Sequence, residues 1–299
     1  MVTTAAAVEI DDTLGGRWTS LVVGGREWLW SRPEPARGRA VPGAPFADAG
    51  GLEECIPTVR GRPDHGEAWS RPWVPDPGSR GRRRHSGLFF ISKVGGPAFQ
   101  LSRGFRLAEG GIAAAYRLTA APGFRFVWAA HALLDLSDRA TLSVPPATTV
   151  RLYPEAAAFL PGPWPPGARF LDRPWPGPGA LRLDRLGGGG PGLGLDGTAI
   201  GAIALDCPEA QVTDGDDRLR LRLRGPAGAP VSVAIWRNLG GFPPGAPYRS
   251  IGVEPMLGAV FDLAEASGPQ DAVTVSASGE VAWDLMITGT GPRPQGPAA

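Results

Sequence analysis

The sequence predicts an all-β protein, either a sandwich or a barrel. Short apolar or alternating runs recur along the 299 residues and are separated by turns rich in the 44 glycines and 33 prolines. Many short strands at such intervals are typical of sandwiches and barrels. No segment has a convincing helical periodicity, so few or no helices are expected.

The N-terminal half predicts two hairpins and one long apolar strand. Each hairpin has a Gly-Gly or a Glu-Gly-Gly turn between its strands, and glycine tolerates the positive φ of a tight turn. The long strand is the run FRFVWAAHALLDL. The predicted strands are residues 17–23, 26–30, 99–107, 112–120 and 124–136.

The C-terminal half predicts further strands at similar spacing. In the run RLRLRLRG, leucines alternate strictly with arginines, which indicates a strand with one buried and one solvated face. The predicted strands are residues 140–144, 149–153, 199–205, 218–225, 231–236, 250–256 and 280–288.

Three segments do not fit strands and are predicted to be long loops. They are residues 31–50, 74–86 and 154–200, which are rich in Pro, Gly or Arg. Loops of this length are usually functional or disordered. We find no internal repeat and no linker between two cores, so residues 1–288 are expected to form one domain. The Gly- and Pro-containing tail, 289–299, is expected to be flexible.

Composition argues against several classes of protein. Thirty Lys and Arg residues against 29 Asp and Glu leave a net charge of +1, unlike the basic excess of a general nucleic-acid binder. No apolar run reaches the ~18 residues of a membrane helix. The N-terminus lacks the basic start of a signal peptide, so a cytoplasmic protein is expected. Cys55 and Cys207 are then expected to be free thiols.

Two polar residues occur in the middle of apolar runs. His131 lies within 124–136, and on a strand it shares its face with Val127, Ala129 and Leu133. Glu254 lies within 250–256, and its pKa should rise if the carboxyl is buried. A polar group in such surroundings needs a partner or a cavity. The alternatives are a satisfied core histidine and an edge-strand glutamate that faces solvent.

Residues 51–73 combine acids, a histidine and two tryptophans. This combination is typical of sugar sites, because the C–H face of a sugar stacks on aromatic rings while its hydroxyls bond to polar groups. The alternative is a loop whose tryptophans fill gaps in the core. The residues concerned are Glu53, Glu54, Asp64, His65, Glu67, Trp69 and Trp73.

Together these motifs resemble the aldose 1-epimerase, or galactose mutarotase-like, family. An HG pair with His65 follows the segment GLEECIPT, a second histidine, His131, lies in an apolar strand, and a Glu-Pro pair with Glu254 lies in a late strand. The chain closes with SGEVAWDLMI, a strand after a Gly-Glu turn. The resemblance spans about residues 9–288. It implies a large twisted antiparallel β-sandwich with the site in a groove across one sheet.

The resemblance also implies roles for individual residues. His131 aligns with the general acid of the family, Glu254 with its general base, and His65 with the histidine that holds the sugar and its ring oxygen. The family has an Arg and an Asp that bind sugar, for which Arg60 and Asp172 are the candidates. The implied reaction interconverts the α and β anomers of a free aldose by proton transfer, with no metal and no cofactor.

A non-catalytic homologue of the same fold is one alternative function. Such a protein would bind a sugar or glycan without turning it over. Its stacking platform would come from tryptophans in the segments 51–73 and 154–200. The candidates are Trp69, Trp73, Trp164 and Trp175. The sequence does not indicate the oligomeric state.

Two other enzymes are also compatible with these residues. A hexose-6-phosphate 1-epimerase could clamp the phosphate with the arginines at 82–84 or with Arg60 and Arg62, since guanidinium groups match phosphate geometry. A glycoside hydrolase or lyase needs two carboxylates roughly 5–9.5 Å apart. Glu254 with Glu67 or Asp64 could supply them, but two histidines fit that chemistry less well.

Overall fold

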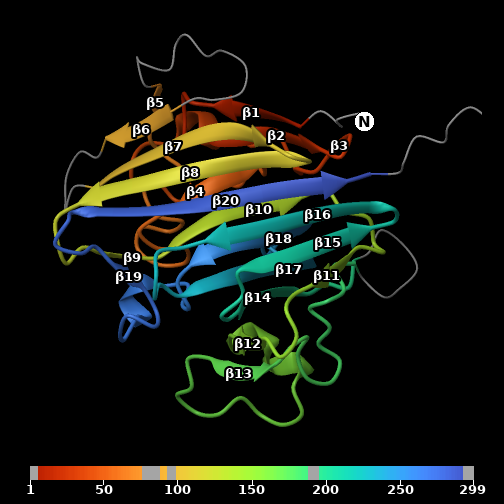
Figure 1. The fold of residues 1–299 in the computed structure, drawn as a ribbon. Coiled ribbons are helices and arrows are strands. Elements are labelled where there is room, and N and C mark those ends of the chain that lie inside the picture. The colour runs from red at the N-terminus through yellow and green to blue at the C-terminus, as the bar shows by residue number, and fades with distance from the viewer. Residues whose placement is uncertain (1–5, 76–87, 93–98, 188–194, 292–299) are drawn as a thin grey trace, which may run out of the picture.

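The computed structural model describes residues 6–75, 88–92, 99–187 and 195–291. Two antiparallel sheets stack face to face, as Figure 1 shows, and the only helices among the described residues are short 3₁₀ turns. These turns are η1 (Arg37–Arg39), η3 (Pro154–Phe159) and η4 (Leu263–Glu265). The predicted all-β class is therefore confirmed, and it is the large antiparallel sandwich that the family resemblance implied.

The first sheet contains ten strands and carries the cavity described below. Its central strands are the buried runs that the sequence predicted to be apolar. In spatial order the strands are β1 (Ala7–Asp11), β2 (Arg17–Val23), β4 (Leu52–Cys55), β10 (Trp128–Leu134), β18 (Tyr248–Leu257), β17 (Val231–Phe242), β14 (Ala199–Ala204), β12 (Thr149–Leu152) and β13 (Leu171–Pro174), with β3 (Arg26–Glu27) on β2.

The second sheet contains eight strands and covers the face of the first sheet that lies opposite the cavity. In spatial order they are β11 (Thr141–Ser143), β15 (Glu209–Asp214), β16 (Asp217–Arg224), β20 (Glu280–Thr290), β8 (Gly111–Ala120), β7 (Phe99–Ala108), β6 (Leu88–Ser92) and β5 (Val74–Pro75). A separate pair joins β9 (Arg125–Phe126) to β19 (Val273–Thr274).

The main core lies between the two sheets. Apolar side chains on the inner faces of both sheets form one continuous buried cluster, including Trp18, Trp128 and Trp283. The alternation predicted for β16 is confirmed: its leucines are buried and its arginines are exposed. Burial of apolar area at roughly 25 cal/mol per Å² is the main stabilising contribution of such an interface.

Some strand boundaries differ from the sequence prediction. The run 124–136 divides into β9 and β10 at Val127, because the Val127 N–H donates to the carbonyl of Pro57 instead of to a neighbouring strand. β4 was missed because Glu53 and Glu54 stand in the middle of it. Each of these carboxylates forms a salt bridge with a buried arginine. β17 extends beyond its predicted end to Phe242, and β20 extends beyond residue 288.

Residues 154–187, which belong to the predicted long loop 154–200, form a lobe beside the sandwich. In Figure 1 this lobe, with β12 and β13, projects from the lower edge of the ten-stranded sheet. It has its own apolar cluster, and Trp164 and Trp175 pack against it. The arginines at 82–84 and residues 292–299 of the expected tail lie outside the described residues.

Cys55 and Cys207 are both buried and free, as the sequence predicted. Cys55 belongs to a smaller apolar cluster next to the cavity strands, and Cys207 belongs to the main core. Among the described residues, no helix is long and apolar enough to span a membrane.

Candidate functional site

A cavity of about 900 Å³ opens on the outer face of the ten-stranded sheet. Its floor is formed by β10, β17 and β18, and its walls by the loops 32–48, 59–65 and 241–248. On β10, the inward face carries Trp128 and Ala130, so His131 points the other way, into the cavity. The long loop predicted over 31–50 therefore forms a wall of the cavity.

His131 and Glu254 lie next to each other on the cavity floor. The pairing of Ala129 with Met256 and of Leu133 with Gly252 fixes the register of β10 and β18, which brings the two residues face to face. His131 Nε2 lies 3.9 Å from Glu254 Oε1. Both side chains are largely buried, yet both line the cavity, so a small ligand can reach them.

Burial moves the pKa values of this pair toward each other. It raises the pKa of the Glu254 carboxyl, with a contribution from the charge of Asp48, while His131 opposes the change. Burial also lowers the pKa of the His131 imidazole, against the opposing effect of Glu254. Among the described residues, we find no hydrogen bond to the Glu254 carboxylate. Compared with the same two groups in water, burial therefore favours the neutral pair over the ion pair.

His65 reaches the same cavity from the loop 59–65. Its φ of 58° is in the left-handed region, which is uncommon for a non-glycine residue and frequent at functional sites. The next residue, Gly66, has to be a glycine, because a Cβ there would lie 2.0 Å from the carbonyl oxygen of Ile56. The HG pair thus has a structural reason. Glycine permits the close pass against Ile56, and that pass directs His65 into the cavity.

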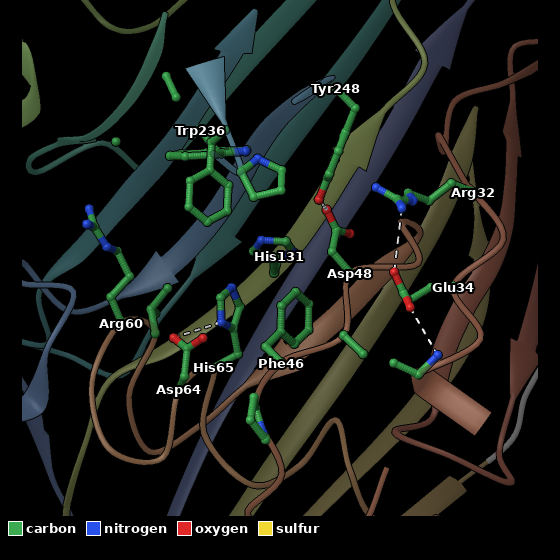
Figure 2. A pocket seen from close by; sticks show the side chains of 18 of the residues that line it. Arg32, Glu34, Phe46, Asp48, Arg60, Asp64, His65, His131, Trp236 and Tyr248 are labelled. Carbon is green, nitrogen blue, oxygen red and sulfur yellow. Dashed lines mark hydrogen bonds and ion pairs between the residues drawn. The ribbon is translucent and has the colours of Figure 1, made fainter. Parts of the chain in front are cut away.

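Asp64 and Phe46 hold the His65 ring. His65 Nδ1 lies 3.1 Å from Asp64 Oδ1. Burial would raise the pKa of Asp64, but the contact with His65 and the charges of His65 and Arg60 outweigh it, so the pKa is lowered. Phe46 stacks on His65 with ring centroids 3.7 Å apart and meets His131 edge-on at 5.6 Å. Figure 2 shows the two histidines with Phe46 beside them.

Asp48 provides a further carboxylate at one end of the cavity. Its Oδ2 accepts a hydrogen bond from the hydroxyl of Tyr248, and its Oδ1 accepts one from the N–H of Gly50. The guanidinium of Arg32 covers the Tyr248 ring at 4.3 Å and lies 3.6 Å from Glu34. Figure 2 shows this polar group on the side of the cavity away from Arg60.

Trp236 and Arg60 line the remaining walls. Trp236 lies on β17, and its indole N–H donates to the hydroxyl of Ser250 at 3.0 Å. Arg60 pairs with Glu155 at 2.7 Å, across from Asp48. Within the described part of the chain, no cluster of three or more His, Cys, Asp or Glu side chains is arranged to hold a metal ion.

The structure brings four of the predicted site residues to the cavity and leaves four away from it. His65, His131, Glu254 and Arg60 line the wall. Trp69 and Trp73 are packed in the interior, at 0% and 2% exposure, so neither ring presents a face to a ligand. Glu67 pairs with Arg71. Asp172 is engaged by Arg151 at the edge strand β13.

Four cavity residues were missed by sequence reasoning. Phe46 and Asp48 lie in the Pro- and Gly-containing loop, where no periodicity marks a side chain that points inward. Trp236 and Tyr248 lie on predicted or extended strands, and only the strand register shows that they face the cavity. The sequence did contain one signal for Phe46 and Asp48. In the segment FAD, an aromatic and an acidic side chain stand among small residues of a loop.

Comparison with solved structures gives the fold its class. The Slr1438 protein from Synechocystis sp. PCC 6803 matches at a TM-score of 0.67 and 14% identity, covering 97% of this chain and 93% of that one. A galactose mutarotase-like protein from Lactobacillus casei matches at 0.59 and 17% identity, over 95% and 99%. A galactose mutarotase related enzyme from Lactobacillus acidophilus matches at 0.62 and 14%, over 97% and 96%.

The chain therefore has the galactose mutarotase-like fold over nearly its whole length. The resemblance found in the sequence is confirmed at this level. We find no family model that matches the sequence, and no curated protein sequence that matches it significantly. Identities of 14–17% carry the fold alone, so the activity has to be argued from the site.

Proposed function

We propose that this protein is an aldose 1-epimerase, which interconverts the α and β anomers of a free reducing sugar. The observation that supports this most directly is the pair of His131 and Glu254 on the cavity floor, 3.9 Å apart. Anomer exchange needs one group that accepts a proton and one that donates a proton, on opposite sides of the same C–O bond. The names of the structurally similar proteins agree with this chemistry.

The reaction follows from two proton transfers. Glu254 accepts the proton of the C1 hydroxyl as the bond between C1 and the ring oxygen breaks. The electron pair of that bond goes to the ring oxygen, which accepts a proton from His131. The product is the open-chain aldehyde. Rotation about the C1–C2 bond and the reverse transfers close the ring on the other face, and no net proton or electron is consumed.

The shifted pKa values suit a reversible reaction. After ring opening, Glu254 holds a proton and His131 has lost one. Because burial raises the first pKa and lowers the second, the free energy of this state relative to the starting state is lower than it would be in water. Positioned acid–base groups of this kind contribute about 10²–10⁴-fold each. His65, fixed by Phe46 and Asp64, would bind near the ring oxygen.

The charges around the cavity favour an uncharged sugar over a sugar phosphate. Five carboxylates line the wall against three guanidinium groups. Two of these guanidinium groups, those of Arg32 and Arg60, are already close to carboxylates. A phosphate dianion would meet more negative than positive charge here. This observation weighs against the phosphate-sugar alternative as far as the described residues are concerned.

The test is two-dimensional exchange NMR on free aldoses and hexose 6-phosphates, with and without the protein. We expect faster anomer exchange for at least one unphosphorylated aldose and no gain for the phosphates. The matched variants are Glu254→Gln, which should abolish the gain, and Glu280→Gln, which removes an exposed carboxylate on β20 and should preserve it.

If a folded protein accelerates exchange for no sugar, the proposal is wrong and a binding homologue is the better description. Saturable binding of a sugar without exchange would identify that case. A clear preference for a hexose 6-phosphate would instead support the phosphate-sugar alternative.

A further inference from the structure

The cavity is larger than one sugar ring requires. A hexose has 12 non-hydrogen atoms, and if each takes no more than the roughly 30 Å³ of a liquid water molecule, the ring fills at most about 360 Å³. The cavity measures about 900 Å³. A hexose placed with its C1 at His131 and Glu254 therefore leaves room for a second group of similar size.

The strand register places an aromatic side chain next to the reacting groups. Glu254 on β18 pairs with Ala234 on β17, and Trp236 is the next residue of β17 on the same face. One repeat of the pleat is roughly 7 Å. Trp236 pairs with Gly201 on one side and Gly252 on the other. Neither neighbour has a side chain, so the cavity remains open around the indole.

Gly252 is required for this opening. A Cβ at that position would lie 2.4 Å from Glu254 Oε1 and 3.0 Å from the Cβ of Trp236. A side chain there would fill the space between the indole and the carboxylate. The glycine therefore keeps a continuous path along the sheet, from the Glu254 carboxylate to the indole of Trp236.

Phe242 continues the aromatic surface toward the rim. Its ring meets that of Trp236 edge-on at 5.8 Å, and 48% of the residue is exposed. Of the large apolar side chains that are exposed in the described part of the chain, it is the one that lines the cavity. Phe242 pairs with Tyr248 on β18. Tyr248 lies six residues from Glu254, which corresponds to roughly 20 Å along the strand.

Polar groups accompany this aromatic surface. The Asp48 carboxylate accepts two hydrogen bonds, from Tyr248 and Gly50, and a carboxylate has about four acceptor sites. It can therefore accept further hydrogen bonds from ligand hydroxyls. An aromatic platform with a carboxylate nearby matches a sugar ring, which has both an apolar C–H face and hydroxyl groups.

We propose that Trp236 and Phe242 form a second sugar subsite, and that the substrate is a reducing disaccharide or a longer reducing oligosaccharide. This inference rests on the proposed function, because it places the reducing ring at His131 and Glu254. The C1 hydroxyl must stay free for the reaction. The additional unit is then joined through another hydroxyl, and its ring extends from the floor toward Phe242.

The experiment compares anomer exchange of glucose and galactose with that of maltose, cellobiose and lactose. We expect at least one disaccharide to have a kcat/KM about tenfold above that of its reducing monosaccharide. Phe242→Ala should lower this ratio about tenfold, the size of one aromatic contact. Leu107→Ala is the matched control, since Leu107 is 45% exposed on β7 of the other sheet. It should leave the ratio unchanged.

Two results would overturn the second subsite while the proposed function stands. One is a monosaccharide that reacts as well as every disaccharide. The other is an equal loss for both substrate classes in Phe242→Ala. If no sugar exchanges faster, the proposed function fails, and calorimetric titration then tests the subsite alone. Tighter binding of a disaccharide that is lost in Phe242→Ala supports it, and equal binding of both sugars overturns it.

Discussion

Glu54 and Glu254 are buried glutamates on opposite faces of the ten-stranded sheet, and they differ in their partners. Glu54 points between the sheets, where its carboxylate accepts hydrogen bonds from Arg103, from the Tyr116 hydroxyl and from the Trp128 indole. Glu254 points into the cavity and has only His131 within salt-bridge distance among the described residues, at 3.9 Å. Both are at most 3% exposed.

The comparison separates a structural charge from the one that we propose to be reactive. Three donors fix the Glu54 carboxylate and use most of its acceptor capacity, so it serves to join the two sheets. Glu254 carries the cost of burial with little compensation, and this cost raises its pKa. A carboxylate in that condition can accept a proton readily, which is what a general base requires.

The largest expected effect is an opposite response of the two glutamates to the same substitution. Glu54→Gln removes the charge that Arg103 faces in the core and should lower the free energy of unfolding by about 3–5 kcal/mol. Glu254→Gln loses no hydrogen bond of the described structure and should leave stability unchanged or higher at neutral pH. Anomer exchange should fall by about 10²–10⁴-fold in Glu254→Gln.

Urea denaturation and exchange NMR on the same two variants measure both quantities. Comparable destabilisation of both would mean that Glu254 is a structural residue like Glu54. In that case the catalytic group would have to be sought elsewhere on the cavity wall.

The same contrast explains what sequence could predict of the site. His131 and Glu254 were found because each is polar in an apolar strand, and period-2 alternation places His131 opposite the core. Glu53 and Glu54 were visible as acids, but their strand was missed. Charged residues in a run oppose a strand assignment unless buried arginines, here Arg37 and Arg103, compensate them.

The remaining errors came from tertiary contacts. Trp69 was expected to stack on sugar, but its ring lies in the interior against Phe46. Local sequence cannot distinguish a tryptophan that fills the core from one that lines a cavity. Trp236 has the cavity position because its neighbours across the strands are Gly201 and Gly252, which are 35 and 16 residues away along the chain.

A second prediction concerns Phe46, whose ring contacts both histidines of the cavity. Phe46→Ala removes the ring that stacks on His65 and touches His131. One aromatic contact is worth about 0.5–1.5 kcal/mol, so kcat should fall by up to about tenfold. Thermal stability should change little, because Phe46 is only half-buried at the cavity wall. Phe46→Tyr should retain activity, and an equal loss in both variants would show that stacking is not the cause.

A third prediction uses the charge of Asp48 to move the pH dependence of the pair. The proposed reaction needs one proton shared by Glu254 and His131, so its rate should be bell-shaped in pH. Asp48 raises the pKa of both groups. Asp48→Asn removes this negative charge, which makes Glu254 easier to ionise and His131 harder to protonate. Both limbs of the profile should therefore move to lower pH.

Glu34→Gln is the matched control, because Glu34 lines the cavity but is not among the charges that act on Glu254. Its acid limb should coincide with that of the unmodified protein. If the two limbs of the pH profile move apart in Asp48→Asn, or do not move, Asp48 does not act on the pair through its charge.

The smallest expected effect is on the pH dependence of stability. Folding raises the pKa of Glu254 above its ordinary 4.5, so within that window the folded state binds more protons than the unfolded state. The free energy of unfolding then falls as pH rises from 4.5 to the folded pKa. His131 acts in the opposite direction, because its pKa is lowered from 6.5 and its contribution rises with pH up to that value.

In the unmodified protein these two slopes partly cancel. Glu254→Gln removes the falling contribution and also removes the charge that supports the protonated form of His131. The stability of the variant relative to the unmodified protein should therefore increase as pH rises from 4.5 to 6.5. Each unit by which folding raises the Glu254 pKa adds about 1.4 kcal/mol. Urea denaturation across this range measures the difference, and a constant difference would mean that Glu254 titrates alike in the folded and unfolded chain.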